Sequence, residues 1–586
     1  MTTALYNFVL EFLSLSWLTG PIFDKELRVS SRRRRNYVLR FAYLALLTIF
    51  LVLFWLQEVP YRGSSGTYLS SRMARAGQTI IMFIVWFQFC VTQIVAVVML
   101  SNSISDEIYH RTLGLLMTTP INSFQIVMGK LFSKLLQLIL LLAISLPLLA
   151  VVRVFGGVPW DYVISSLCIT LTAAIFVGSL SLFFSIFSRR AYVVIIMTFF
   201  TLGMLFAVLP LFTTLFLRHV VSDREFSSVL SYLNPYFLLG LNTEAMMSPR
   251  IGGWMTTFSW PLHCATMLAG SAFVLFLSVC WVRKVALRQA TGQLGTSSRR
   301  RSNRKPASGS GGRPRRVKGP PVLWKELRSP VLGRRKIITF AVIIGCLILL
   351  FITYGLCERG GILDEEGIHI LYVFIFMCLG MLFTIVLPAT CITSEKESRS
   401  WPLLLATTLS DWKIISGKFI GILRRCLPIW FVLFGHIIVF TLAQMIHPIA
   451  IIQMVILVAW VVVFLSGTGL YFSSRFRRTT TAVIMNFTLA AVIWAIVPLL
   501  LVLIAQMMHE HEFLEAYMET NPFFHAIVVM DGTIGHWGRL GRYYWMTSEM
   551  DAVESTYFML TIMLGYMFLG FLFVWRAKCR LRRNIF

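Results

Sequence analysis

Lys25-Glu26-Leu27-Arg28 occurs again as Lys325-Glu326-Leu327-Arg328, 300 positions later, and each copy stands ahead of a basic cluster and a long apolar run. Further matches follow at a spacing of 288: Glu107 with Glu395, Leu115-Leu116 with Leu403-Leu404, and Gly129-Lys130 with Gly417-Lys418. An ordered series of matches at one spacing indicates that the chain is a duplication. Its period is far longer than the roughly 20 to 50 residues of a solenoid repeat.

The composition is that of a membrane protein. Of the 586 residues, 57% are hydrophobic and 13% charged, and the mean hydropathy is +0.75. Apolar runs of roughly 20 residues predict helical spans, because β-barrel strands alternate and are about half as long. We therefore predict an all-α polytopic membrane protein with about twelve transmembrane helices in two parallel, pseudo-symmetric six-helix repeats. The predicted spans are 38–57, 78–101, 134–152, 161–187, 191–217, 262–282, 336–356, 369–392, 426–446, 449–474, 480–507 and 556–575.

The placement of the basic residues explains the net charge of +27. If the N-terminus is cytoplasmic, most Lys and Arg fall at cytoplasmic ends of spans, as the positive-inside rule requires. We therefore expect a multi-pass protein of the plasma (inner) membrane with both termini cytoplasmic. The excess charge indicates attraction to anionic membrane lipids rather than to nucleic acid, which we do not expect as a partner.

The chain divides into two halves and a linker. We predict a first half at 1–287, a disordered basic linker at 288–318 and a second half at 319–586, because the linker is rich in Gly, Ser, Pro and Arg and cannot bury a core. Six spans return the chain to its starting side, so both halves enter the membrane in the same orientation. A pathway between the halves is the expected consequence.

The loop between the second and third spans is the strongest functional candidate in each half. Residues 103–130 and 392–418 each contain a charged helical turn, a Leu-Leu pair with Thr, a polar turn and a second short helix that we expect to close at Gly-Lys. A solvated connector is the alternative, but about 2 to 8 residues suffice to join antiparallel helices. Exposed leucines on such a hairpin favour a partner that covers them.

These residues resemble the membrane subunit of ABC-2 type exporters over the whole chain, twice. The resemblance rests on Glu-x6-Gly-Leu-Leu, Thr-Thr-Pro and Gly-Lys ahead of the third span, and the second copy departs from it at Pro402 and Thr408. It implies that both loops couple to a separate ATPase. The implied coupling residues are Glu107, Arg111, Leu115, Leu116, Glu395, Arg399, Leu403 and Leu404. The implied interfacial elbow helices contain Lys25, Glu26, Arg28, Lys325, Glu326 and Arg328.

The sequence has no ATP-binding loop of its own. Gly129-Lys130 and Gly417-Lys418 lack the upstream glycine of a P-loop and are followed by Leu131 and Phe419 rather than Ser or Thr. We therefore expect a non-catalytic permease subunit without a cofactor, with ATP on a partner ATPase dimer. The apolar and aromatic spans favour a lipidic or amphipathic substrate.

Two alternatives remain. An ion-coupled secondary transporter usually needs acidic residues inside the membrane, and the predicted span interiors contain none. We interpret His436 as a helix-to-helix hydrogen-bond partner rather than a proton relay. A non-transporting membrane scaffold or sensor could use the same loops to bind its partner, and copurification with an ATPase would separate these possibilities.

Other motifs give weaker indications of function. His509-Glu510-His511-Glu512 lacks the spacing of a zinc site, and the ten cysteines form no CxxC pair, so no metal is expected. Two external loops, 218–261 and 508–555, each contain an Asn-Pro-aromatic step, Asn234-Pro235-Tyr236 and Asn521-Pro522-Phe523. Asn-Pro favours the start of a helix. A helix dipping toward the external mouth is the alternative.

Overall fold

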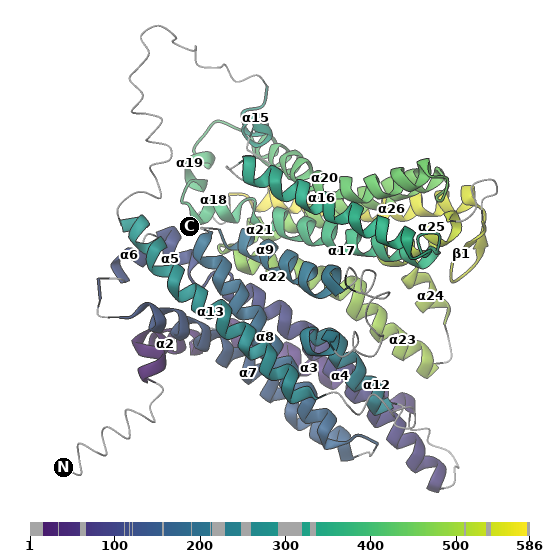
Figure 1. Cartoon of the computed structure of the whole chain (residues 1–586). Coiled ribbons are helices and arrows are strands. Elements are labelled where there is room, and N and C mark those ends of the chain that lie inside the picture. Colours follow the sequence, from purple (N-terminus) through teal and green to yellow (C-terminus); the bar gives the residue numbers. More distant parts are fainter. Residues whose placement is uncertain are drawn as a thin grey trace. The chain divides into compact units, whose positions relative to one another are not determined.

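The chain folds into two compact helical units, Met1–Ser310 and Gly311–Phe586, which we describe separately (Figure 1). The computed structural model describes residues 16–32, 34–58, 66–110, 112–116, 118–119, 121–154, 157–188, 190–210, 213, 229–247, 259–290, 319–328, 336–508, 511–534 and 541–582. Nearly all of these residues are helical, so the all-α prediction is confirmed.

The first unit contains the helix predicted to be interfacial, the connector helices and the first set of spans. Its helices are α2 (Ser16–Ser31), α3 (Arg34–Glu58), α4 (Gly66–Leu100), α5 (Ser105–His110), α6 (Leu113–Leu116), α7 (Ser123–Val154), α8 (Trp160–Phe187), α9 (Ala191–Gly203), the π-helical turn η1 (Met204–Val208), α12 (Pro235–Met247) and α13 (Trp260–Ala290). Because α13 reaches Ala290, it includes the first residues of the predicted linker; residues 291–318 lie outside the described residues.

The second unit repeats this order and adds a small β-hairpin. Its elements are α15 (Pro321–Arg328), α16 (Lys336–Arg359), α17 (Glu366–Thr390), α18 (Thr393–Glu397), α19 (Trp401–Leu405), α20 (Asp411–Leu442), α21 (Ile449–Arg475), α22 (Thr479–Ala491), the π-helical turn η3 (Val492–Ile496), α23 (Val497–Met508), α24 (Glu512–Met518), α25 (Pro522–Thr533), β1 (Tyr543–Tyr544), β2 (Glu549–Met550) and α26 (Ala552–Arg580). The strands β1 and β2 pair antiparallel.

The predicted spans correspond to helices. In the described part of the chain, 11 helices are long and apolar enough to cross a membrane. The remaining predicted span, 336–356, lies within α16. The prediction of a polytopic helical membrane protein is therefore confirmed.

One central helix organises each unit. In the first unit α8 packs on α4 and α13, and the Ser181 hydroxyl donates to the Val97 carbonyl of α4 at 3.0 Å. In the second unit α21 packs on α26 and α17. There a Cβ on Gly467 would lie 2.3 Å from the Gly570 carbonyl oxygen, so the backbones of α21 and α26 touch. Small residues allow such close packing between membrane helices.

The long helices α7 and α20 differ from the sequence prediction. We expected a short helix closing at Gly129-Lys130 and Gly417-Lys418, but α7 continues unbroken from Ser123 to Val154 and α20 from Asp411 to Leu442. The prediction was wrong because a glycine ends a helix only where the chain turns away. Here the lysine side chains are buried inside the unit, which fixes the helix in place.

The two loops predicted to be external confirm that each Asn-Pro step starts a helix. α12 begins at Pro235 and α25 at Pro522. The Asn234 side-chain oxygen accepts from the Tyr236 backbone N–H, and the Asn521 oxygen accepts from the Phe523 N–H, each at 3.0 Å. Each asparagine therefore caps the helix that its proline begins.

The same asparagines hold the π-helical turns of the fifth span. Pro210 and Pro498 lack the N–H that an α-helix would donate to the carbonyl four residues back, at Phe206 and Trp494. The Asn234 side-chain amide donates to the Phe206 carbonyl at 2.9 Å, and the Asn521 amide donates to the Trp494 carbonyl at 2.8 Å. Each asparagine thus replaces a donor that a proline removed, which is how prolines are tolerated within membrane helices.

Candidate functional site

Two loops form the candidate site, one in each unit. We call residues 103–130 the first connector and residues 392–418 the second connector. The first contains α5, α6 and the start of α7, and the second contains α18, α19 and the start of α20. Each lies beside the helix that we predicted to be interfacial in its own unit, because α2 packs on α7 and α15 packs on α20 (Figure 1). We keep the name interfacial helix for α2 and α15.

The short helices α6 and α19 each bury an apolar side chain in the unit and expose another on its surface. Leu113 and Trp401 occupy matching positions and are fully buried. Two positions later, Leu115 is 71% exposed and Leu403 is 74% exposed. Burial of the first residue fixes the short helix, and the leucine one half-turn on is then held outward. Leu116 and Leu404 are half-buried.

A second exposed apolar residue follows in each connector. Phe124, at the start of α7, and Trp412, at the start of α20, occupy matching positions and are both exposed. The threonines between the leucine and the aromatic residue are also exposed in both copies. We call Leu115 with Phe124, and Leu403 with Trp412, the outer faces of the two connectors.

Beneath the second outer face lies a buried ion cluster. Lys418 is 1% exposed, and its Nζ lies 2.9 Å from Glu395 Oε2 of α18 and 3.6 Å from Glu326 Oε1 of α15. Glu326 also pairs with Arg425 at 2.5 Å, and Glu395 with Lys325 at 3.0 Å. One lysine therefore joins the second connector to its interfacial helix.

Charge attraction sets the protonation state of Glu395. Burial acts to raise the pKa of this carboxyl, but Lys418 and Lys325 together hold the pKa below its usual value. Glu395 is therefore ionised at neutral pH and forms ion pairs with both lysines.

Two glycines allow this close approach. A Cβ on Gly421 would lie 2.6 Å from the Glu326 Cβ, and a Cβ on Gly417 would lie 3.0 Å from the Leu323 backbone nitrogen. Larger residues at these positions of α20 would push α15 away and separate Glu326 from Lys418. The Gly-Lys pair that resembled part of a phosphate-binding loop thus packs two helices together.

The first unit contains separate pairs in the corresponding places. Lys130 Nζ lies 2.7 Å from Glu107 Oε1 and donates to the Ser103 carbonyl at 2.6 Å. Glu26 of α2 pairs instead with Lys134, one turn along α7, at 3.5 Å. Among the described residues, no ion pair joins Lys130 to Glu26, so the connector and the interfacial helix do not share a cation.

A lysine found only in the second copy fastens α18 to the end of α21. Lys396 Nζ donates to the carbonyls of Ser473 and Phe476, each at 3.1 Å, and to that of Ser474. Burial lowers the pKa of Lys396 to about 8. The matching residue of the first copy is the buried Ile108, which can make no such bonds.

The remaining predicted residues lie around these clusters. Arg399 is exposed between α18 and α19, with a left-handed φ of 56° at the chain reversal. Lys25 and Arg28 are exposed on α2, and the Arg328 guanidinium lies over the Trp324 ring at 4.9 Å. Arg111 lies outside the described residues.

Sequence reasoning missed the basic partners of the two glutamates. Lys130 and Lys418 were visible as a repeated Gly-Lys pair, so their matching positions were the available signal. Lys134 and Arg425 are not at matching positions, and the pattern could not have identified them.

The deep polar residues make contacts between helices. His436 Nδ1 and the Tyr354 hydroxyl lie 2.6 Å apart across α20 and α16, which agrees with the interpretation of His436. The Ser145 hydroxyl donates to Gln88, and the Thr468 hydroxyl donates to Asn486. These bonds satisfy buried polar groups.

The residues considered for a metal form no such site where the structure describes them. Among those residues there is no group of three or more His, Cys, Asp or Glu side chains that could hold a metal ion. His525 Nε2 lies 2.5 Å from the Glu519 carbonyl oxygen, and His509, Glu510 and His536 lie outside the described residues.

Comparison with known proteins identifies one matching family. The family model described as "ABC-2 family transporter protein" matches the chain twice, at residues 21–287 and 320–574. Among curated proteins, no match was found.

Proposed function

The chain belongs to the ABC-2 transporter family, and from this premise we propose that it is a permease subunit with two fused halves that couples to a separate ATPase through its two connectors. Membership makes it a membrane transporter subunit of a non-catalytic family. The docking surface, the ATPase dimer and the substrate are the parts that we propose.

The exposed side chains of the two outer faces are the main support for this proposal. Among the described residues of their connectors, Leu115 and Leu403 are the most exposed apolar side chains, and they occupy matching positions. Exposed leucine and aromatic side chains in one connector are unfavourable in water unless a partner covers them. Two such faces, one in each half, suit a partner that has two equivalent subunits, as an ATPase dimer does.

The buried ion pairs give these faces a rigid base. Because Lys418 binds both Glu395 and Glu326, a displacement of the second connector would carry the interfacial helix α15 with it. Separating these charges would leave ions buried without partners, which costs about 3–5 kcal/mol. Movement imposed by ATP-driven closure of the partner would therefore reach the helix that leads into α16.

Glu107 and Glu395 are poor positions for testing the docking surface. Both glutamates lie in buried or partly buried ion pairs, so reversing their charge would disturb the fold as well as docking. Leu115 and Leu403 have exposed side chains and are the better positions for substitution.

The test is copurification of the ATPase with the permease. We expect the combined Leu115→Asp and Leu403→Asp substitutions to reduce copurification and permease-stimulated ATP hydrolysis by at least about tenfold, since a buried carboxylate at each contact is strongly unfavourable. Phe513→Asp is the matched control, because Phe513 is equally exposed but lies on α24, beyond the other end of the spans.

The outcome separates the alternatives. If both variants retain the ATPase and its stimulation, the connectors are not the docking surface. If no ATPase copurifies with the unaltered protein while a different membrane partner does, the scaffold function is favoured. We also propose that the substrate is lipidic or amphipathic. A transport assay in reconstituted vesicles tests this proposal.

A further inference from the structure

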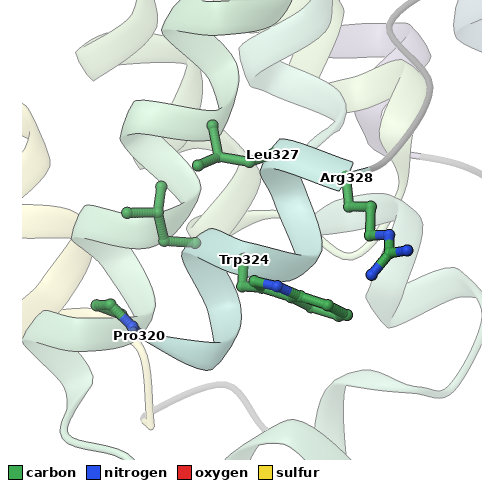
Figure 2. A pocket seen from close by; sticks show the side chains of 5 residues that line it. Pro320, Trp324, Leu327 and Arg328 are labelled. Atoms are coloured by element: carbon green, nitrogen blue, oxygen red, sulfur yellow. The ribbon is translucent and has the colours of Figure 1, made fainter. Parts of the chain in front are cut away.

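A shallow hollow lies on the exposed side of the interfacial helix α15. It has a volume of about 350 Å³ and is lined by Pro320, Leu323, Trp324, Leu327 and Arg328. Figure 2 shows Trp324 and Arg328 on one side of the helix, with Leu327 extending away from them. The hollow combines an aromatic ring, a cation and aliphatic side chains.

The opposite side of α15 is occupied by the protein. Val322 and Glu326 are buried against α20, where Gly417 and Gly421 allow close approach. The residues that line the hollow are therefore on the face that α20 does not cover. Leu327 is exposed and Trp324 is half-buried.

Arg328 is the cation of α15 that has no carboxylate partner among the described residues. Lys325 pairs with Glu395, and Glu326 is neutralised by Lys418 and Arg425. Within the described part of the chain, no carboxylate pairs with Arg328; its guanidinium lies 4.9 Å from the centre of the Trp324 ring. The ring orients the guanidinium and leaves its N–H donors free for an anion.

The position of α15 in the chain sets its depth. It precedes α16, which contains the predicted span 336–356, and the sequence between them contains Arg334 and Arg335. Tryptophan and basic residues gather at the boundary of a membrane, where an indole lies among headgroups and cations attract anionic lipid. A hollow at this depth is exposed to phosphate groups and to the glycerol region beneath them.

We propose that this hollow binds the headgroup of an anionic phospholipid from the leaflet in which α16 begins. Arg328 binds the phosphate through its guanidinium, the Trp324 N–H supplies a further donor, and Leu323 and Leu327 contact the glycerol and the first methylenes. The site requires membrane insertion of α16 but not the coupling to an ATPase.

The first copy provides a natural comparison. Its matching segment is Pro21-Ile22-Phe23-Asp24-Lys25-Glu26-Leu27-Arg28, in which Asp24 stands where the second copy has Trp324. An exposed carboxylate at that position repels a phosphate and cannot hold the guanidinium by its ring face. We therefore assign the lipid site to the second copy alone.

The experiment is native mass spectrometry of the purified full chain in detergent, titrated with phosphatidylglycerol or phosphatidylcholine. We expect one phosphatidylglycerol to bind more tightly than phosphatidylcholine. Arg328→Gln should weaken that event about fivefold, since a basic residue near the surface contributes about 1 kcal/mol to anionic lipid binding. Trp324→Asp, which copies the first half, should weaken it further, and Arg28→Gln is the matched control with no expected effect.

Three results would overturn the proposal. One is equal binding of the two lipids, since the hollow would then be an apolar groove without headgroup recognition. Another is equal weakening by Arg28→Gln and Arg328→Gln, because the effect would then be general surface charge. The third is displacement of phosphatidylglycerol by free glycerol phosphate at similar concentration. Gel filtration and thermal unfolding of each variant identify any loss of folding, and a conservative Arg328→Lys variant should retain part of the binding.

Discussion

Lys130 in the first unit pairs with Glu107 and leaves Glu26 to Lys134, whereas Lys418 in the second unit pairs with both Glu395 and Glu326. The glutamates and the first lysine of each set occupy matching positions in the duplicated sequence. The difference depends on which side-chain contacts form and not on which residues are present at these positions. It indicates that the second connector is tied to its interfacial helix more firmly than the first.

Removing the shared lysine should give the largest difference between the units. Lys418→Met removes the buried cation that Glu395 and Glu326 share and leaves each with a single, more exposed partner, and we expect it to lower the free energy of unfolding by about 3–5 kcal/mol. Lys130→Met leaves only Glu107, which is 21% exposed, and should cost about 1–3 kcal/mol. Thermal unfolding in detergent measures both, and equal losses would contradict the difference between the clusters.

The fifth predicted spans of the two halves, 191–217 and 480–507, should lose similar stability on matching substitutions. The two connectors, in contrast, should lose different amounts. Asn234→Leu and Asn521→Leu each leave the Phe206 or Trp494 carbonyl without its side-chain donor, and each should cost about 1–3 kcal/mol. Restoring the backbone donor with Pro210→Ala or Pro498→Ala in the same unit should recover part of the loss. If the proline replacements give no recovery, the asparagines do not act by replacing the missing N–H groups.

The lysine unique to the second copy should make that copy sensitive to pH. Burial lowers the pKa of Lys396 to about 8, against about 10.4 for an unfolded lysine. Between these values the unfolded chain binds more protons, so the stability from this group rises with pH and is lost as pH falls through about 8. The melting temperature of the wild type relative to Lys396→Ile should increase from about pH 7 to about pH 10. A constant difference would contradict this assignment.

The outermost lysines should give the smallest difference. Lys325 pairs with Glu395 but is largely exposed, so Lys325→Ala should cost less than about 1 kcal/mol and less still at high salt. Lys25→Ala should be nearly neutral, since in the described part of the chain Lys25 has no ion pair with Glu107. Thermal unfolding at two salt concentrations tests this, and a loss from Lys325→Ala as large as that from Lys418→Met would show that the outer pair supports the cluster.

The duplicated tetrapeptide and the apolar runs were sufficient to predict two helical membrane halves. Both signals are local in the sequence, and long apolar segments have few stable forms in lipid. The exposed leucines of the connectors were also predicted, because a Leu-Leu pair in a charged loop must turn at least one side chain outward.

The ion clusters and the π-helical turns could not be predicted in the same way. Lys418 is separated by 92 residues from Glu326 in the chain, and only folding decides whether it reaches one glutamate or two. The Asn-Pro steps indicated helix starts, but nothing in them indicated carbonyls 27 or 28 residues earlier. Contacts of this kind depend on how helices rotate against one another, which hydropathy does not specify.

The π-helical turns also place one extra residue in each fifth span. Leu209 donates to the Met204 carbonyl and Val497 to the Val492 carbonyl, five residues back in both cases. If such a turn relaxed to an α-helical one, everything beyond it would rotate by about 100° and advance by about 1.5 Å. The prolines oppose that relaxation, and the asparagines fasten the bulge to α12 and α25. Asn234 and Asn521 therefore hold the register of each fifth span, and with it the face that the span presents beyond the turn.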